Sequence, residues 1–237
     1  MSRVKDMTHG NPAKLIFFFA LPLIIGNLGQ QIYMITDTVI VGQGVGLDAL
    51  ASLGATDWIY WLVLWSVQVL TQGFAVLITQ NIGEGNEKAV KKSIAMSTLL
   101  CLTMGTLVSA TFPFLASPLL RLLKTPEDIF AGALSYVVVM YAGTLIVMAY
   151  NMASAVLRSF GDGKTPLIAM IIAAAVNIGL DLLLVMGFHW GITGAAVATI
   201  LSQLLAFLYC LRMIGKIPAA KLQKEDWALD FPVILKL

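Results

Sequence analysis

The sequence predicts an all-α polytopic membrane protein, a bundle of six transmembrane helices. Of its 237 residues, 59% are apolar and 12% are charged, whereas soluble domains carry about 25% charged residues. The mean hydropathy is +0.87. The apolar residues also gather into runs long enough to cross a hydrocarbon core about 30 Å thick. These observations together predict that the chain folds in a bilayer.

Apolar length and breaker residues divide the chain into six expected helices. They cover residues 14–42, 55–80, 93–117, 129–154, 166–187 and 192–214. The first two end at glycine-rich loops (42–48 and 83–88), and the third ends at a loop that contains a proline (121–126). The fourth ends at a charged glycine-containing loop (158–164), and the fifth at the short loop 187–191.

The region after the sixth helix differs in composition from the bundle. We expect a transmembrane lobe over residues 1–214 and a cytoplasmic linker over residues 215–237. Because this tail turns apolar again at Phe231, we expect it to lead toward the next helical element of a longer protein.

The distribution of Lys and Arg predicts the orientation of the bundle. Thirteen of the 15 lie before the first helix, in the second and fourth loops, or after the sixth helix; the other two are Arg121 and Lys124. Both termini are therefore expected in the cytoplasm, as six crossings require. We expect a multi-pass protein of the inner (plasma) membrane.

Composition also limits the class of function. A net charge of +2 does not suggest a nucleic-acid partner. Cys101 and Cys210 both lie in apolar runs and form no CxxC motif, so they are interpreted as packing residues. Because the sequence contains no nucleophile–base set, metal-ligand cluster or phosphate loop, we expect neither an enzyme nor a bound cofactor.

Polar residues inside the fifth predicted helix are the main functional signal. Asn177 and Asp181 are four residues apart and share one helical face within an apolar run. A carboxylate at this depth costs several kcal/mol unless it faces a partner, an ion or water (about 2.5–3.5 kcal/mol on insertion scales).

Two further polar residues lie at a similar expected depth. Asp37 and Asp181 are each about 8–9 Å below the outer ends of their helices, Thr199 about 12 Å and Asn177 about 15 Å. Two carboxylates, an amide and a hydroxyl form a hard-oxygen cluster suited to Na⁺ or to a shared proton. The alternative is structural: each group can also serve as a hydrogen-bonding contact between helices.

Other polar and sulfur-containing residues are candidates for bending a helix or lining a cavity. Pro22 can loosen the backbone of the first helix and let it bend. The candidate cavity-lining residues are Asn27, Gln30, Met34, Gln68 and Gln72. For Trp65, Gln68 and Gln72, cavity lining and helix packing are equally good explanations.

Acidic and aromatic residues near the start of the second helix are interpreted more simply. Trp58 and Trp61 are expected to anchor the helix at the membrane interface. Asp57 is expected near the outer boundary, where water can solvate it.

Three stretches of the sequence resemble the multidrug and toxic compound extrusion (MATE) transporters. The first combines Pro22 with the segment QIYMITDTVIVG at 31–42 and the segment ALASLG at 49–54. The second is LRSFGDGKTP at 157–166. The third is NIGLD at 177–181 followed by GITGAAVAT at 191–199. Together they extend over nearly the whole chain.

This resemblance implies a two-lobe fold and a cation site, which go beyond what the residues alone predict. Members of the family have twelve helices in two six-helix lobes, so the chain would be the amino-terminal lobe and its partner a second lobe. In similar prokaryotic members this lobe holds a cation site. The matching residues here are Asp37, Asn177, Asp181 and Thr199, with Na⁺ or H⁺ as the coupling ion.

The expected function is therefore half of a cation-coupled antiporter that exports amphipathic or cationic compounds by alternating access. One alternative is a flippase for lipid-linked oligosaccharides in the same superfamily, for which a basic cavity would be evidence. Another is a non-transporting membrane scaffold. A scaffold would place Asp37 and Asp181 against separate neighbours, more than about 10 Å apart, because oxygens that share an ion lie within about 2.6 Å of it.

Overall fold

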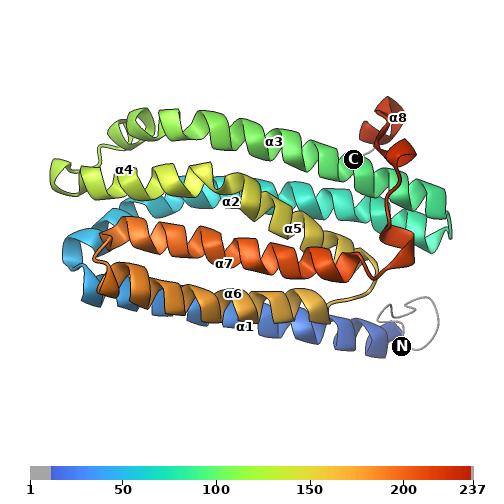
Figure 1. The fold of residues 1–237 in the computed structure, drawn as a ribbon, viewed down its shortest axis with the longest axis horizontal. Coiled ribbons are helices and arrows are strands. Elements are labelled where there is room, and N and C mark those ends of the chain that lie inside the picture. The colour runs from blue at the N-terminus through green and yellow to red at the C-terminus, as the bar shows by residue number, and fades with distance from the viewer. Residues whose placement is uncertain (1–11, 236–237) are drawn as a thin grey trace.

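The computed structural model describes residues 12–235, except for some side chains of the first helix, and shows an elongated bundle of helices (Figure 1). No strand occurs within these residues, which confirms the all-α prediction. The long helices are α1 (Pro12–Gly44), α2 (Leu47–Gly83), α3 (Glu87–Leu122), α4 (Glu127–Ala142), α5 (Thr144–Ser159), α6 (Lys164–Asp181) and α7 (Gly191–Ile214).

The lengths of these helices agree with a multi-pass membrane protein. Among the described residues, four helices are long and apolar enough to cross a membrane: α2, α3, α6 with its continuation to Gly187, and α7. The bent pair α4–α5 provides a fifth span. α1 is 33 residues long and lies beside α6, so it is the sixth helix of the predicted bundle.

The fourth predicted helix is broken rather than continuous. The sequence predicts one helix over 129–154, but α4 and α5 meet at Gly143 with a bend of 47°. Gly143 lies directly against α7: a Cβ at this position would be only 2.2 Å from Cδ1 of Ile200. The close approach of α7 at this residue accompanies the bend, and only glycine leaves room for it.

The fifth predicted helix, 166–187, changes its form at Asp181. The α-helix ends at this residue, and Leu182–Gly187 continue as a π-helix. The amide of Phe188 donates to the carbonyl of Leu183 at 2.8 Å, which closes a wide five-residue turn. π-Helical segments are rare and frequent at functional sites. Asp181 is the last residue before this change.

The second helix begins earlier than its apolar run suggests. α2 starts at Leu47 instead of residue 55, so Asp57 is ten residues, or about 15 Å, from its start. Because α2 has 37 residues, or about 55 Å, it is longer than a hydrocarbon core of about 30 Å, and the place of Asp57 relative to the outer boundary stays a prediction. The apolar run underestimated the helix because its first turns contain small and polar residues such as Ser52, which is buried and donates to the carbonyl of Ile129 at 3.2 Å.

The segment after α7 folds back along the bundle. It contains the 3₁₀ turns η2 (Pro218–Ala220) and η3 (Lys224–Trp227) and the short helix α8 (Phe231–Ile234), all of which contact α3 (Figure 1). The Nζ of Lys92 on α3 donates to the carbonyl of Ala228. This expected linker thus packs on α3 as far as it is described.

α7 is the central helix and contacts α4, α5 and α6. Small residues line its buried side, and they let neighbouring backbones approach closely. These residues are Gly194, Ala195, Ala196, Ala198, Ser202 and Ala206. The core consists of two apolar clusters, one near the α2–α3 and α5–α6 loops and one near the α1–α2 and α3–α4 loops. This packing fixes α6 against α7.

The bend at Gly143 gives a stability prediction. Gly143→Ala should destabilise the fold by about 1–3 kcal/mol, because the new methyl group overlaps the Ile200 side chain. Thermal unfolding in detergent measures this effect. The matched control is Gly73→Ala, since a Cβ at Gly73 meets nothing within 4 Å. Ile200→Ala should restore part of the loss in the double variant, and simple additivity of the two changes would refute the proposed overlap.

Candidate functional site

The predicted site residues lie on three helices that are neighbours in the fold. α1 carries Asp37, α6 carries Asn177 and Asp181, and α7 carries Thr199. α6 packs against both α1 and α7, and α1 also contacts α7. The sequence could not establish these contacts. They bring all four residues to one region of the bundle.

The carboxyl groups of Asp37 and Asp181 are in direct contact, at hydrogen-bonding distance. Asp181 is fully buried and Asp37 is partly buried. The Oδ1 atoms of both residues are buried and have no hydrogen-bond partner among the described residues. Two carboxylates offer only acceptors to each other. This contact is therefore satisfied only when a proton or a cation lies between the two groups.

Asn177 links Asp181 to α7. In the amide orientation that satisfies both of its polar atoms, Nδ2 donates to Oδ2 of Asp181 at 2.7 Å. The amide oxygen then accepts from the backbone N–H of Thr199 at 3.2 Å. In the opposite orientation Nδ2 would instead donate to Oγ1 of Thr199, at 3.3 Å. In either case the Asn177 side chain, which is fully buried, connects α6 to α7 at this point.

The C-terminal end of α1 packs closely against the π-helical segment. A Cβ at Gly44 would be 3.1 Å from Cγ1 of Val185. α1 can approach this closely because Gly44 has no side chain. The approach helps to place Asp37, seven residues earlier on α1, beside Asp181.

The chemistry of the cluster suits a small cation. It combines two carboxyl groups, one amide oxygen or nitrogen and one hydroxyl group. Within the described residues, no three His, Cys, Asp or Glu side chains are grouped as a transition-metal site would require. Oxygen donors with two carboxylates suit a hard ion such as Na⁺ or a shared proton. Cation binding by these residues stays a prediction.

A separate polar cavity of about 250 Å³ lies between α1, α2, α5, α6 and α7. Gln68 and Gln72, candidates from the sequence, line it, as does Gly26 of α1. Met34 is half-buried, and its carbonyl accepts from Oγ1 of Thr38 at 2.8 Å. The side chains of three further candidates lie outside the described residues: Pro22, Asn27 and Gln30.

Sequence reasoning did not select the polar side of α5 that lines this cavity. Asn151, Ser154 and Arg158 occur at spacings of three and four, so they lie on one helical side. Tyr150 also lines the cavity. The spacing of these polar residues is the sequence signal that indicates a cavity-facing side of α5. It was missed because Arg158 was considered only as a loop charge that sets orientation.

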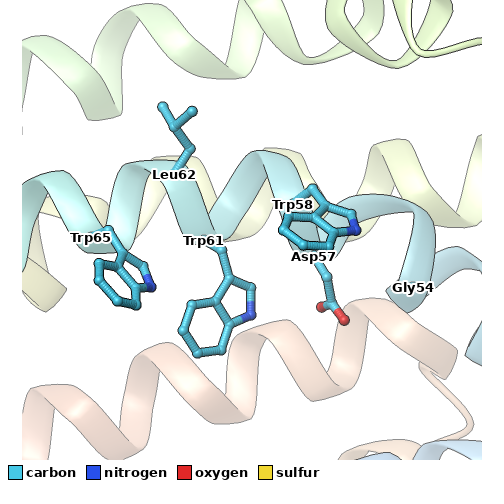
Figure 2. A pocket seen from close by; sticks show the side chains of 6 residues that line it. All are labelled: Gly54, Asp57, Trp58, Trp61, Leu62 and Trp65. Atoms are coloured by element: carbon cyan, nitrogen blue, oxygen red, sulfur yellow. The ribbon is translucent and has the colours of Figure 1, made fainter.

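An open pocket lies along the side of α2, and Figure 2 shows its lining. Its residues are Gly54, Asp57, Trp58, Trp61, Leu62 and Trp65. The side chains of Asp57, Trp61 and Trp65 extend to the same side of the helix in this view (Figure 2). The described lining therefore comes from α2 alone, and its one charged group is Asp57.

Comparison with known proteins identifies relatives over the whole bundle. The MatE family model matches residues 22–183. A probable multidrug resistance protein of Bacillus subtilis, YpnP, is 34% identical over 235 residues, which is 98% of this chain and 53% of that protein. A probable multidrug resistance protein of Thermotoga maritima, NorM, is 31% identical and matches 80% of this chain and 42% of its own.

A solved structure gives the same result for the fold. A MOP-superfamily transporter from Pyrococcus furiosus superposes with a TM-score of 0.89 at 24% identity. The match covers 96% of this chain and 50% of that one. The chain thus spans about half the length of the relatives that it matches.

The contact made by Asn177 predicts a stability effect. Asn177→Ala should lower the free energy of unfolding by about 1–3 kcal/mol, because it leaves a buried oxygen of Asp181 without its donor. Thermal unfolding in detergent tests this. Asn151→Ala is the control: its Nδ2 donates at 2.8 Å to Val147 on the same helix, so its loss should cost less. Equal losses for both variants would contradict the assigned link to Asp181.

Proposed function

The chain belongs to the MatE family of multidrug and toxic compound extrusion transporters, and we propose that it forms the amino-terminal half of a cation-coupled exporter. Its substrates would be small amphipathic or cationic compounds, in keeping with relatives that are named for multidrug resistance. The proposed partner is a second six-helix lobe. The proposal requires no cofactor other than the coupling ion, Na⁺ or H⁺.

The observation that carries this proposal is the contact between the carboxyl groups of Asp37 and Asp181. Two like charges about 4 Å apart repel by about 4 kcal/mol at an effective dielectric constant of about 20. A cation or a proton between them removes this repulsion and joins α1 to α6. Release of the ion restores the repulsion, which favours separation of the two helices. The contact therefore makes the position of α1 sensitive to the ion.

The packing of the three helices determines which of them moves. Asp181 and Asn177 are held in the tightly packed α6–α7 pair, whereas α1 lies at the edge and packs mainly on α6. Movement of α1 thus disturbs less of the core than movement of α7. In the proposed cycle the ion enters from outside, α1 bends near Pro22, and the cavity between α1, α2, α5, α6 and α7 changes shape. Rocking of the two lobes completes alternating access.

The alternatives have less support. A scaffold predicted separate surroundings for Asp37 and Asp181, and their contact counts against it. A flippase for lipid-linked saccharides predicted a basic cavity. Arg158 is the one charged side chain among the described residues that line the cavity, and this is weak support for such a ligand.

The cation site predicts loss of coupling in two variants. In the full-length protein that contains this segment, Asp37→Asn and Asp181→Asn should each reduce ion-driven efflux to background. Each change removes one of the two charges that the ion must bridge. Efflux from proteoliposomes under imposed Na⁺ and H⁺ gradients, applied in turn, measures this and identifies the ion. Asp48→Asn is the control, since Asp48 is exposed in the first turn of α2. Normal pumping by both site variants would refute the site.

In the proposed orientation, both ends of the chain lie on the cytoplasmic side of the inner membrane. A thiol at Glu84→Cys, in the exposed α2–α3 loop, should react with an impermeant maleimide only after permeabilisation. A thiol at Phe188→Cys, which is exposed at the other end, should react in intact spheroplasts. Cys101 and Cys210 are buried and provide a low background. The reverse labelling pattern would overturn this orientation.

A further inference from the structure

The pocket on α2 is not explained by the cation cluster. Its volume is about 590 Å³, which lies in the range of about 300–1,000 Å³ that is typical of small-molecule sites. The residues that face it are three tryptophans, one leucine, one glycine and the carboxylate of Asp57 (Figure 2).

Asp57 lies well inside α2 rather than in its first turn. Asp57 is about 15 Å from the outer start of α2, whereas Asp37 is about 10 Å from the outer end of α1. The two carboxylates therefore lie at comparable depth in antiparallel helices. Asp57 is exposed and makes no hydrogen bond or ion pair with any described residue. A carboxylate that faces the hydrocarbon core is strongly disfavoured, so we infer that the Asp57 side of α2 is open to water or to a polar partner.

The tryptophans are spread too far along the helix to serve as one interfacial anchor. Trp58 and Trp65 are seven residues apart, which is about 10 Å along the helix axis. Interfacial aromatic residues gather at the level of the headgroups. Trp58 is 83% exposed and Trp65 is 60% exposed. Both indole side chains are exposed, as Asp57 is, so a ligand can reach all three.

The arrangement of the indole rings suits a cation. The centroids of Trp61 and Trp65 are 6.4 Å apart, and their planes are inclined by 41°. Neighbouring inclined rings provide two π faces, and indole is the side chain that binds cations best through its face. Asp57 adds a negative charge one helical turn from Trp61. A bulky ligand with a positive charge would complement both features.

We propose that Asp57, Trp58, Trp61 and Trp65 form a recognition site for bulky organic cations, distinct from the Asp37–Asp181 cation site. The carboxylate supplies charge selection, and the indole faces supply contact area that tolerates different shapes. This inference rests on the proposed exporter function for its place in a substrate path. Binding at the site itself does not require an ion gradient.

Equilibrium binding to the full-length protein in nanodiscs tests the proposal. The probes are tetraphenylphosphonium and tetraphenylborate, which have the same shape and opposite charges. Asp57→Asn should weaken tetraphenylphosphonium binding about tenfold and leave tetraphenylborate binding unchanged or tighter. Trp61→Leu should also weaken tetraphenylphosphonium binding, and Trp61→Phe should recover part of it. The controls are Asp48→Asn and Trp190→Leu, which alter an exposed carboxylate and an exposed tryptophan elsewhere.

The possible outcomes separate this site from the exporter function. The proposal is overturned if Asp57→Asn changes tetraphenylphosphonium affinity by less than twofold, or if it weakens both probes equally. It is also overturned if Trp61→Leu binds as the parent protein does. Efflux by the Asp37→Asn variant tests ion coupling and is measured independently. The recognition site on α2 can therefore be refuted while ion coupling is supported, and ion coupling can be refuted while the recognition site is supported.

Discussion

The contact between the Asp37 and Asp181 carboxyl groups is the constraint on which the rest of the bundle depends. It places two acceptor-only groups together in an apolar environment, and each has one buried oxygen without a partner among the described residues. Such a contact persists only with a positive charge between the groups. In the proposed function, α1 and α6, the helices that carry them, are therefore joined through an ion or a proton as well as through apolar packing.

The remaining architecture fixes the position of Asp181, one of the two residues in this contact. Small residues on α7 allow α6 to pack closely, and Asn177 connects Asp181 to the backbone of Thr199. The π-helical segment begins directly after Asp181, and the C-terminal end of α1 approaches it at Gly44. The bend at Gly143 lets α4 and α5 both follow α7. By contrast, α1 lies at the edge of the bundle and packs mainly on α6.

Three polar regions have separate roles in the proposed transport function. The carboxyl cluster joins α1 to the core, the cavity beside it presents amides, hydroxyls and Arg158, and the pocket on α2 presents Asp57 with three tryptophans. The cluster and the cavity share α1 and α6, so ion binding at the first can alter the second. The α2 pocket is separate from both in its described lining. A transporter with separate ion and substrate sites can couple them through helix movement rather than by direct competition.

The sequence by itself determined the class, the number of helices and the four residues of the cluster, because apolar length and helical rise are local quantities. It did not determine that α4 and α5 bend at Gly143, since the cause is Ile200 on a distant segment. It predicted that the second helix starts at residue 55, because apolar composition does not mark the true start of α2 at Leu47. Only the tertiary structure could decide that α1, α6 and α7 are neighbours. Matched depth brings Asp37 and Asp181 to one layer, but their contact depends on which helices pack side by side.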